Sequence, residues 1–348
     1  MGTEARPALG SPVARARVRA CPEDFRVYEE GLPEPDGSGE HLWLHLRKRG
    51  HNTDDLARHI AREAGVRRSA VSWSGRKDRH AVTEQWFSVQ LPGREDPDFR
   101  WPEGVELLQA VRHGRKLRPG THRRNRFVLR LRELQGDRDE LEGRLRRVAA
   151  DGVPNYFGVQ RFGTGGGNFA RARAWLLGQG PAPRGRSRRS LWLSAARSEL
   201  FNRVLVRRVE EGVWNAVLDG DILQPRDSRG LFREEEDPRV GERVAAGEVH
   251  PTAPLPGTGG MASSGACARL EARVLAPEQA LIEALGQQGV EAARRATRLF
   301  PRDFRREWVE DGLELEFRLP AGAFATTVLA ELVLCEGERE EEQGEKQQ

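Results

Sequence analysis

The residues best suited to chemistry lie at 75–79, where the sequence reads GRKDR. Asp78 is the single acid of this stretch, and it lies among three basic residues: Arg76, Lys77 and Arg79. Alternating apolar residues follow at 85–91, so the stretch is predicted to be a turn just before a strand. A carboxylate in this setting is either a solvated turn residue or an anion held among cations for catalysis.

The composition favours a folded protein that acts inside the cell. The chain has 348 residues, of which 37% are hydrophobic and 32% charged, and its net charge is only +4. It lacks an apolar run of about 18 residues and an apolar leader, so we expect a cytoplasmic protein without a membrane span. The three cysteines are far apart, which predicts neither a disulfide framework nor a metal site.

Periodicity divides the chain into an α+β pattern. Alternation predicts strands near 69–73 and at 41–47, 85–91, 126–134 and 313–319. Spacing near 3.6 predicts helices at 52–65, 137–151, 194–211 and 278–300, with another after 319. Gly152 and Pro154 mark a first domain boundary. The strand-rich segments at the two ends of the chain therefore flank a middle segment in which helices are predicted. This arrangement indicates one domain interrupted by another.

Basic residues cluster at two places. Residues 112–126 contain seven Lys or Arg and no acid, and RGRSRR occupies 184–189. Such runs are either solvated loops or nucleic-acid contacts. The nearby aromatic residues Phe127, Tyr156 and Phe157 favour RNA, because cations bind phosphate and rings stack on bases. The predicted phosphate contacts are Arg115, Lys116, Arg123 and Arg124. The glycine-rich stretch 163–168 lacks a P-loop pattern and is predicted to be a turn.

Seven blocks of this sequence resemble the TruD family of tRNA pseudouridine synthases, in the same order. Three of them are SGRKDRHAVTEQWFSV, GVPNYFGVQRFG and FRVYEE followed by GEHLWLHLRKRGHNT. The others are RNRFVLRLRE, LWLSAARSELFN, EAARRATRLFP and LPAGAFATTVL. The resemblance extends from about 17 to 334, which is nearly the whole chain.

The resemblance implies a pseudouridine synthase fold, with a mixed, mainly antiparallel sheet and flanking helices. The catalytic domain is expected at 1–154 and 304–348, interrupted by an inserted α/β domain at 155–303. An acidic tail, predicted to be disordered, starts at about 336. The expected partner is tRNA, with no cofactor, metal or membrane, and nothing in the sequence indicates an obligate interface, so a monomer is expected.

The implied reaction is the isomerisation of uridine 13 in the D arm of tRNA. It breaks the N1–C1′ bond, turns the uracil and joins C5 to C1′. The carboxylate of Asp78 would either attack C1′ or remove the C2′ proton. The cation that pairs with Asp78 stays open at this level; the candidates are the neighbouring Arg76, Lys77 and Arg79, and Arg19, where the family tends to have a basic residue. Lys77 is alternatively a phosphate contact or a solvated turn charge.

Because the target base must leave its stack, the resemblance also implies an aromatic pocket. It assigns base or substrate contacts to Phe25, Asn125, Phe127 and Phe324. Each has a plainer interpretation: Phe127 and Phe25 as core residues on strands, Asn125 as a turn residue, and Phe324 as the first apolar residue of the last helix.

Two other functions fit parts of the pattern. An RNA-binding protein without catalysis would use the basic loop and the rings, but would leave GRKDRHAVTEQ unexplained. A glycoside- or nucleoside-hydrolysing enzyme would pair Asp78 with a second carboxylate such as Glu84, but the sequence has no paired-carboxylate motif.

Overall fold

The computed structural model describes residues 3–336, in two compact units. The helical unit comprises residues 3–13, Arg138–Phe300 and Ala323–Val333, and the sheet unit comprises Ala14–Asp137, Pro301–Gly322 and residues 334–336. Each unit thus combines segments from distant parts of the sequence. The tail predicted to be disordered lies at 337–348, outside the described residues.

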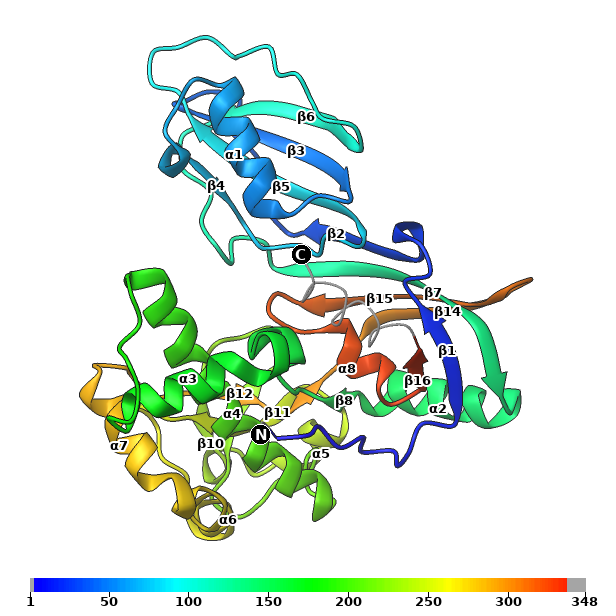
Figure 1. Cartoon of the computed structure of the whole chain (residues 1–348). Coiled ribbons are helices and arrows are strands. Elements are labelled where there is room, and N and C mark those ends of the chain that lie inside the picture. The colour runs from blue at the N-terminus through cyan, green and yellow to red at the C-terminus, as the bar shows by residue number, and fades with distance from the viewer. Residues whose placement is uncertain (1–2, 337–348) are drawn as a thin grey trace. The chain divides into compact units, whose positions relative to one another are not determined.

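The sheet unit is built on a ten-stranded mixed, mainly antiparallel sheet, counted over residues 3–336 (Figure 1). Its main path runs in the order β14-β15-β7-β2-β5-β3-β6, while β1 pairs with β7 and β16, and β4 pairs with β5. The strands are β1 Ala14–Val18, β2 Phe25–Glu30, β3 His41–Arg49, β4 Val71–Trp73, β5 Val82–Gln90, β6 Val105–His113, β7 Arg124–Gly136, β14 Arg302–Val309, β15 Gly312–Pro320 and β16 Val333–Glu336.

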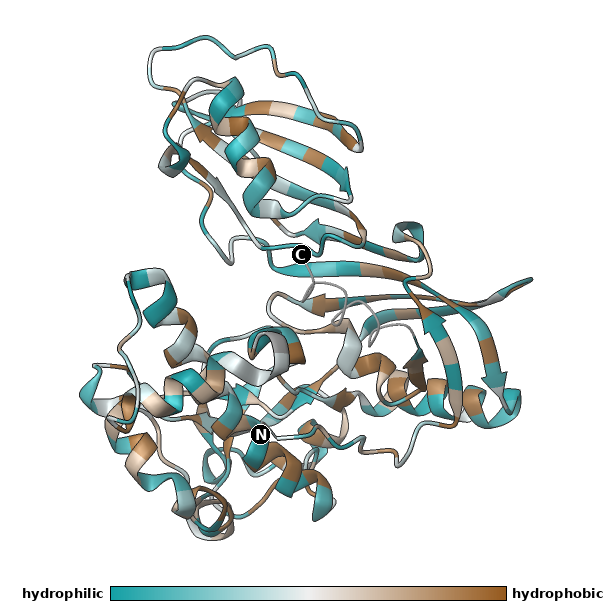
Figure 2. Ribbon diagram, in the orientation of Figure 1, coloured by the Kyte–Doolittle hydropathy of each residue, from teal (hydrophilic) through white to brown (hydrophobic). Residues whose placement is uncertain are grey.

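Alternating side chains explain why these segments form one sheet. Hydrophobic and hydrophilic residues alternate along its strands (Figure 2). In β15 the predicted apolar set, Leu313, Leu315, Phe317 and Leu319, is fully buried. Helix α1, Thr53–Glu63, buries Leu56 and Ile60 against the apolar side chains of β3 and β5. Burial of one face of each element holds this half of the sheet together.

The helical unit surrounds helix α4, Arg186–Glu210, which contacts α3, α6 and β11. The helices are α2 Arg138–Asp151, α3 Gly167–Leu176, α5 Val240–Ala245, α6 Gly265–Leu275, α7 Gln279–Gln287 and α8 Ala325–Leu329. A small sheet has the order β10-β9-β11-β12, and β8 pairs with β13. These strands are β8 Val153–Pro154, β9 Ile222–Pro225, β10 Phe232–Arg233, β11 Val249–Leu255, β12 Ala293–Ala296 and β13 Arg298–Leu299.

Most of the predicted elements are present, and α2 buries the predicted stripe of Leu141, Leu145 and Val148. The prediction of helices near 278–300 is right for the first part of this range and wrong for the second. Helix α7 ends at Gln287, and Gly289 follows with a φ of 70°, which a glycine adopts easily at a helix end. The chain then pairs with β11 as strand β12, because a strand partner is available there. Strand β6 has no clear alternation and was not predicted from the sequence.

Among residues 3–336, no helix is long and apolar enough to cross a bilayer. In the same range, no three His, Cys, Asp or Glu side chains are grouped as metal ligands.

Candidate active site

The GRKDR stretch forms an irregular connection between β4 and β5, as predicted (Figure 1). Its first residue must be small. A Cβ added at Gly75 would lie 2.8 Å from the His122 ring, 2.9 Å from Lys77 Nζ and 3.3 Å from Glu29 Oε1. Gly75 therefore allows the backbone to approach a buried cluster of charged and polar side chains.

Side chains from two neighbouring elements hold this connection. The backbone N–H of Lys77 donates to Thr53 Oγ1 at 3.0 Å, and that hydroxyl is itself 2.9 Å from Gln85 Oε1. The amide of Gln85 donates in turn to the carbonyl of Gly75 at 3.2 Å. Thr53 and Gln85 are both buried, so the loop is tied to the start of α1 and to β5.

Asp78 pairs with Arg19, one of the cations proposed for it. Arg19 Nη2 lies 3.1 Å from Asp78 Oδ2, and the Asp78 side chain is 33% exposed. Arg19 has a φ of 60°, a left-handed conformation that costs an ordinary residue about 1 kcal/mol or more. The surrounding structure therefore imposes an unfavourable backbone where this guanidinium meets the carboxylate.

One predicted substrate contact, Phe25, lies against Arg19, and two others, Asn125 and Phe127, lie on the neighbouring strand β7. The guanidinium of Arg19 is 4.1 Å from the centre of the Phe25 ring, which meets Phe127 edge-on at 6.3 Å. Asn125 and Phe127 are two residues apart on β7, so their side chains share a face of the sheet. Asn125 is buried, and its Oδ1 has no hydrogen-bond donor among the described residues.

The rings of Phe25 and Phe127 are also core residues, as their plainer interpretation predicted. Phe25 is 2% exposed and Phe127 is 6% exposed. The ring of Phe127 stacks on Phe317 of β15 with centres 5.7 Å apart. Most of the Phe127 ring is therefore covered by protein.

Lys77 does not contact Asp78 through its side chain in this structure. Its ammonium lies 2.6 Å from Glu29 Oε1, with exposed fractions of 5% for Lys77 and 0% for Glu29. Burial raises the pKa of Glu29, while Lys77 and the N–H of Trp86 oppose this rise. Since Glu29 lies directly opposite Asn125 in the β2–β7 pair, the ion pair borders the same face as Phe25 and Phe127.

Lys48 approaches Asp78 from the interior of the sheet unit. Its ammonium is fully buried and donates to the carbonyls of His51 at 2.7 Å and Asp78 at 2.9 Å. Burial lowers the pKa of Lys48 to about 8; the negative charge of Asp78 opposes this shift, and the positive charge of Lys77 adds to it. Burying a lysine without a carboxylate partner costs free energy. Because the Lys48 ammonium donates to the Asp78 carbonyl, we infer that it helps to position the Asp78 backbone.

His122 completes the cluster behind the loop. Its Nδ1 is in hydrogen-bond contact with the hydroxyl of Ser74, and both residues are buried. Burial lowers the pKa of His122 to about 4, and the nearby Lys77 charge adds to this shift. His122 is therefore neutral at pH 7.

The remaining predicted residues are distributed between the two units. Phe324 belongs to the helical unit, where its ring packs beside Gly158 and against the core of that unit. In the sheet unit, Arg115, Lys116 and Arg123 are exposed. Lys116 donates to the carbonyl of Ser69 at 2.7 Å, and Arg124 is 3.7 Å from Glu30. Glu84, the alternative second carboxylate, is bound by Arg47 at 2.9 Å.

Sequence reasoning did not find Lys48 or Glu29. A signal for Lys48 was present, since it continues the register of Leu42, Leu44 and Leu46 and so points to the apolar face of β3. A charged residue in that register indicates a buried cation with a specific partner. The same signal was present for Glu29, since it continues the register of Phe25 and Val27 on the buried face of β2.

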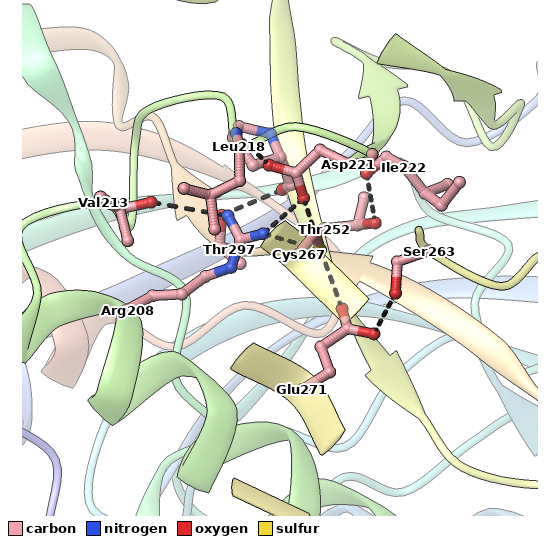
Figure 3. A network of polar contacts seen from close by, with 12 residues as sticks. Arg208, Val213, Leu218, Asp221, Ile222, Thr252, Ser263, Cys267, Glu271 and Thr297 are labelled. Atoms are coloured by element: carbon pink, nitrogen blue, oxygen red, sulfur yellow. Dashed lines mark hydrogen bonds and ion pairs between the residues drawn. The ribbon is translucent and has the colours of Figure 1, made fainter. Parts of the chain in front are cut away.

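A second buried charge network lies in the helical unit (Figure 3). Arg208 and Asp221 form an ion pair in which both side chains are fully buried. The thiol of Cys267 donates to Asp221 at 3.1 Å, and Arg294 forms an ion pair with Glu271. Burial, together with the charges of Asp221 and Glu271, strongly raises the pKa of the Cys267 thiol, which is therefore a packed donor rather than a nucleophile.

Similarity to known proteins identifies the class of protein that has this fold and this cluster of side chains. The family model described as tRNA pseudouridine synthase D (TruD) matches residues 8–171 and 186–332. A protein named tRNA pseudouridine synthase D from Pseudomonas aeruginosa strain LESB58 is 47% identical over 330 residues, covering 94% of this chain and 92% of that protein. One of the same name from Azotobacter vinelandii is 48% identical over 332 residues, covering 94% and 93%.

The fold agrees with this class. A crystal structure of the putative tRNA pseudouridine synthase D from Methanosarcina mazei superposes with a TM-score of 0.72 at 22% identity, covering 94% of this chain and 95% of that one. The architecture is thus the α+β fold of a pseudouridine synthase. The chain belongs to the tRNA pseudouridine synthase D family, and it is an enzyme of the isomerase class.

Proposed function

We propose that the chain converts uridine to pseudouridine in tRNA, at position 13 of the D arm, with Asp78 as the catalytic carboxylate. The observation that carries the proposal is the Arg19–Asp78 ion pair next to Phe25, with Asn125 and Phe127 on the neighbouring strand face. Phe324, from LPAGAFATTVL, is proposed as a further aromatic contact of the base. Catalysis is assigned to 1–154 and 304–348, with 155–303 as the insertion.

The geometry suits chemistry at a ribose carbon. Asp78 is partly exposed, while Lys48 and Thr53 hold the loop from behind, so its carboxylate has a set position and access to a ligand. The guanidinium of Arg19 lies 3.1 Å from the carboxylate that both routes use. In either route the N1–C1′ bond breaks, the C5–C1′ bond forms, and the C5 proton is released while N1 gains one.

Asn125 supports recognition of the base. Its buried Oδ1 lacks a donor among the described residues, and an imide N–H of uracil is a donor of the matching kind. Phe127, on the same face of β7, is suited to support a base rather than to exchange protons, since a phenyl ring has no ionisable group.

Release of tritium from unmodified tRNA bearing C5-tritiated uridine tests this function. We expect wild type to release tritium and Asp78→Asn to lose at least about a thousandfold in rate, because the variant keeps the shape but removes the charge. Asp54→Asn is the matched control. It removes the acid of the nearby helix α1 that pairs with Arg76, and this variant should release tritium at the wild-type rate.

The outcomes separate the three functions. Binding of tRNA without tritium release would identify an RNA-binding protein, and free uracil would identify a hydrolase. Wild-type release by Asp78→Asn would remove Asp78 from the mechanism.

We also propose that Arg123 and Arg124 bind phosphates of the tRNA, together with Arg115 and Lys116. Replacing Arg123 and Arg124 by Ala should weaken binding and reduce the slope of log affinity against log salt by about 0.7 per lost contact. Titration of tRNA at several KCl concentrations measures this slope. An unchanged slope would show that Arg123 and Arg124 do not contact the RNA.

A further inference from the structure

Charge is unevenly distributed along the part of the sequence that begins the helical unit. From Gly152 to Ser198 the chain has eight arginines and neither Asp nor Glu, although the net charge of the whole chain is only +4. Cations in such a run repel one another unless groups of opposite sign lie near them. Carboxylates from other segments must therefore neutralise these arginines, or some of them face solvent with an unbalanced charge.

Four of the eight arginines bind groups within the helical unit. Arg173 forms an ion pair with Glu278, at 3.4 Å. The side chains of Arg161, Arg189 and Arg197 donate to neutral acceptors, which are a hydroxyl, a side-chain amide and backbone carbonyls. These four arginines therefore have partners that the fold itself supplies.

The other four arginines are Arg171, Arg184, Arg186 and Arg188. All four are exposed, and their side chains have no hydrogen-bond or ion-pair partner among residues 3–336. Three of them lie within the five residues 184–188, and we call these three the arginine patch. The patch begins in a segment, 172–185, that the family model does not match, so membership of the family does not by itself assign it a role.

The arginine patch lies at a part of the backbone that is held in place. Helix α4 begins at Arg186, and the side chain of Arg189 donates to the carbonyl of Gln288 at 3.0 Å and to its Oε1 at 3.1 Å. This contact ties the first turn of α4 to the end of α7. Trp192, one turn after Arg188, is buried in the core of the unit. A ligand of the patch therefore does not have to order a mobile loop.

These arginines do not stabilise the helix at which they lie. The first turn of α4 contains no acidic residue. Cations at the beginning of a helix oppose the helix dipole, which has its positive end there. Their charge therefore acts outward, as a positive potential that attracts a polyanion to this surface.

We propose that the arginine patch binds the phosphate backbone of the substrate tRNA, in addition to the phosphate contacts proposed in the sheet unit. A guanidinium presents a planar set of donors that matches two phosphate oxygens. Contacts of this kind hold and orient an RNA without reading its bases. The inference rests on the proposed function, because that function supplies the RNA.

An anionic membrane surface is the other polyanion that a group of arginines attracts. A helix that lies on a membrane has several exposed apolar side chains beside its cations. The structure describes every residue from 184 to 198, and the single large hydrophobic side chain exposed there is Leu191, at 41%. The patch is therefore better suited to a hydrated phosphate backbone than to a lipid surface.

The test measures the affinity for an unmodified tRNA transcript over a range of KCl concentrations. The patch variant carries three substitutions: Arg184→Gln, Arg186→Gln and Arg188→Gln. We expect its log–log salt slope to fall by about 2, from about 0.7 for each of the three lost contacts, which corresponds to about 50-fold weaker binding at 0.15 M salt. Replacing the same three arginines by Lys keeps the charge and should keep most of the slope.

A matched control removes the same charge from the same unit. It carries Arg207→Gln, Arg239→Gln and Arg273→Gln, and each of these arginines already forms an ion pair with a glutamate of the helical unit. The control should bind tRNA with a salt slope near that of wild type. If the patch variant had the same slope as the control, the proposal would be wrong.

Thermal unfolding separates binding from a structural role. Because the patch opposes the helix dipole, the patch variant should melt at the same temperature as wild type or higher. Weaker binding with an unchanged salt slope and a lower melting temperature would mean that the arginines maintain the structure rather than contact phosphate, and would overturn the proposal.

Vesicles that contain phosphatidylglycerol test the alternative polyanion. If the patch variant loses vesicle binding but keeps the wild-type salt slope with tRNA, the patch binds lipid and the RNA assignment is wrong. Tritium release by wild type is measured separately. Its absence would reject the proposed function, while the salt slope would still decide whether RNA phosphate binds at the arginine patch.

Discussion

Charged side chains are buried in both compact units, but they are neutralised in different ways. In the helical unit, Arg208 and Asp221 are both fully enclosed, and the network closes on itself through Cys267 and Glu271 (Figure 3). In the sheet unit, Lys48 is bound by carbonyl groups, and Arg19 is paired with a carboxylate that is one-third exposed.

Buried charge can therefore contribute to stability in one unit and to function in the other. The Arg208–Asp221 network pairs its own charges, and both side chains are fully buried away from any ligand. The cluster around Asp78 holds a backbone loop from the inside and presents one carboxylate outward. Burying Lys48 without a carboxylate of its own lowers its pKa to about 8, and this cost indicates that the position of Asp78 matters.

The largest effect on stability is expected from breaking the closed network. Arg208→Met leaves Asp221 buried and unpaired, which should lower the free energy of unfolding by about 3 to 5 kcal/mol. The double variant Arg208→Met/Asp221→Leu removes both charges and should recover most of that loss. Urea unfolding measures both. Equal destabilisation by the single and double variants would show that the charge pair is not the origin of the loss.

Breaking the cluster behind Asp78 should instead reduce catalysis. Lys48→Met removes the donor to the Asp78 and His51 carbonyls, and we expect kcat for tritium release to fall by about 10- to 100-fold with KM nearly unchanged. Lys48→Arg keeps the charge and should restore part of the rate. If KM rose and kcat stayed constant, Lys48 would act on tRNA binding rather than on the Asp78 loop.

The pH dependence of stability provides an independent measure of Lys48. Its pKa is about 8 in the folded protein, below the ordinary value of 10.5. Between these values the unfolded chain keeps a proton that the folded protein has released, so folded stability rises with pH in this window. The unfolding free energy of wild type should therefore rise relative to Lys48→Met between pH 8 and 10.5, by up to about 3 kcal/mol. A constant difference would mean that Lys48 titrates normally.

The smallest effect is expected at Arg76, which neighbours Asp78 in sequence. Its guanidinium is 71% exposed and pairs with Asp54 at 3.1 Å. Arg76→Ala should change the free energy of unfolding by less than about 0.5 kcal/mol and leave tritium release unchanged. A large loss of rate would show that the exposed side of GRKDR also takes part in catalysis.

Much of the fold follows from local patterns. Alternation located β3, β5, β7 and β15, and helical spacing located α1 and α2. Strand β12 was missed because its basic residues resemble a helix surface, and only pairing with β11 makes the segment extended. A strand at the border of a small sheet depends on its neighbour more than on its own residues.

Local sequence was enough to predict that Asp78 lies in a turn between two strands, among several cations. Which of these cations pairs with Asp78 depends on the packing of distant segments. Arg19 comes from 59 residues away, Lys77 turns to Glu29, and Lys48 holds the backbone from the sheet interior. Side chains at adjacent turn positions diverge, so their partners depend on which strands lie beside them, and strand pairing is a property of the whole chain.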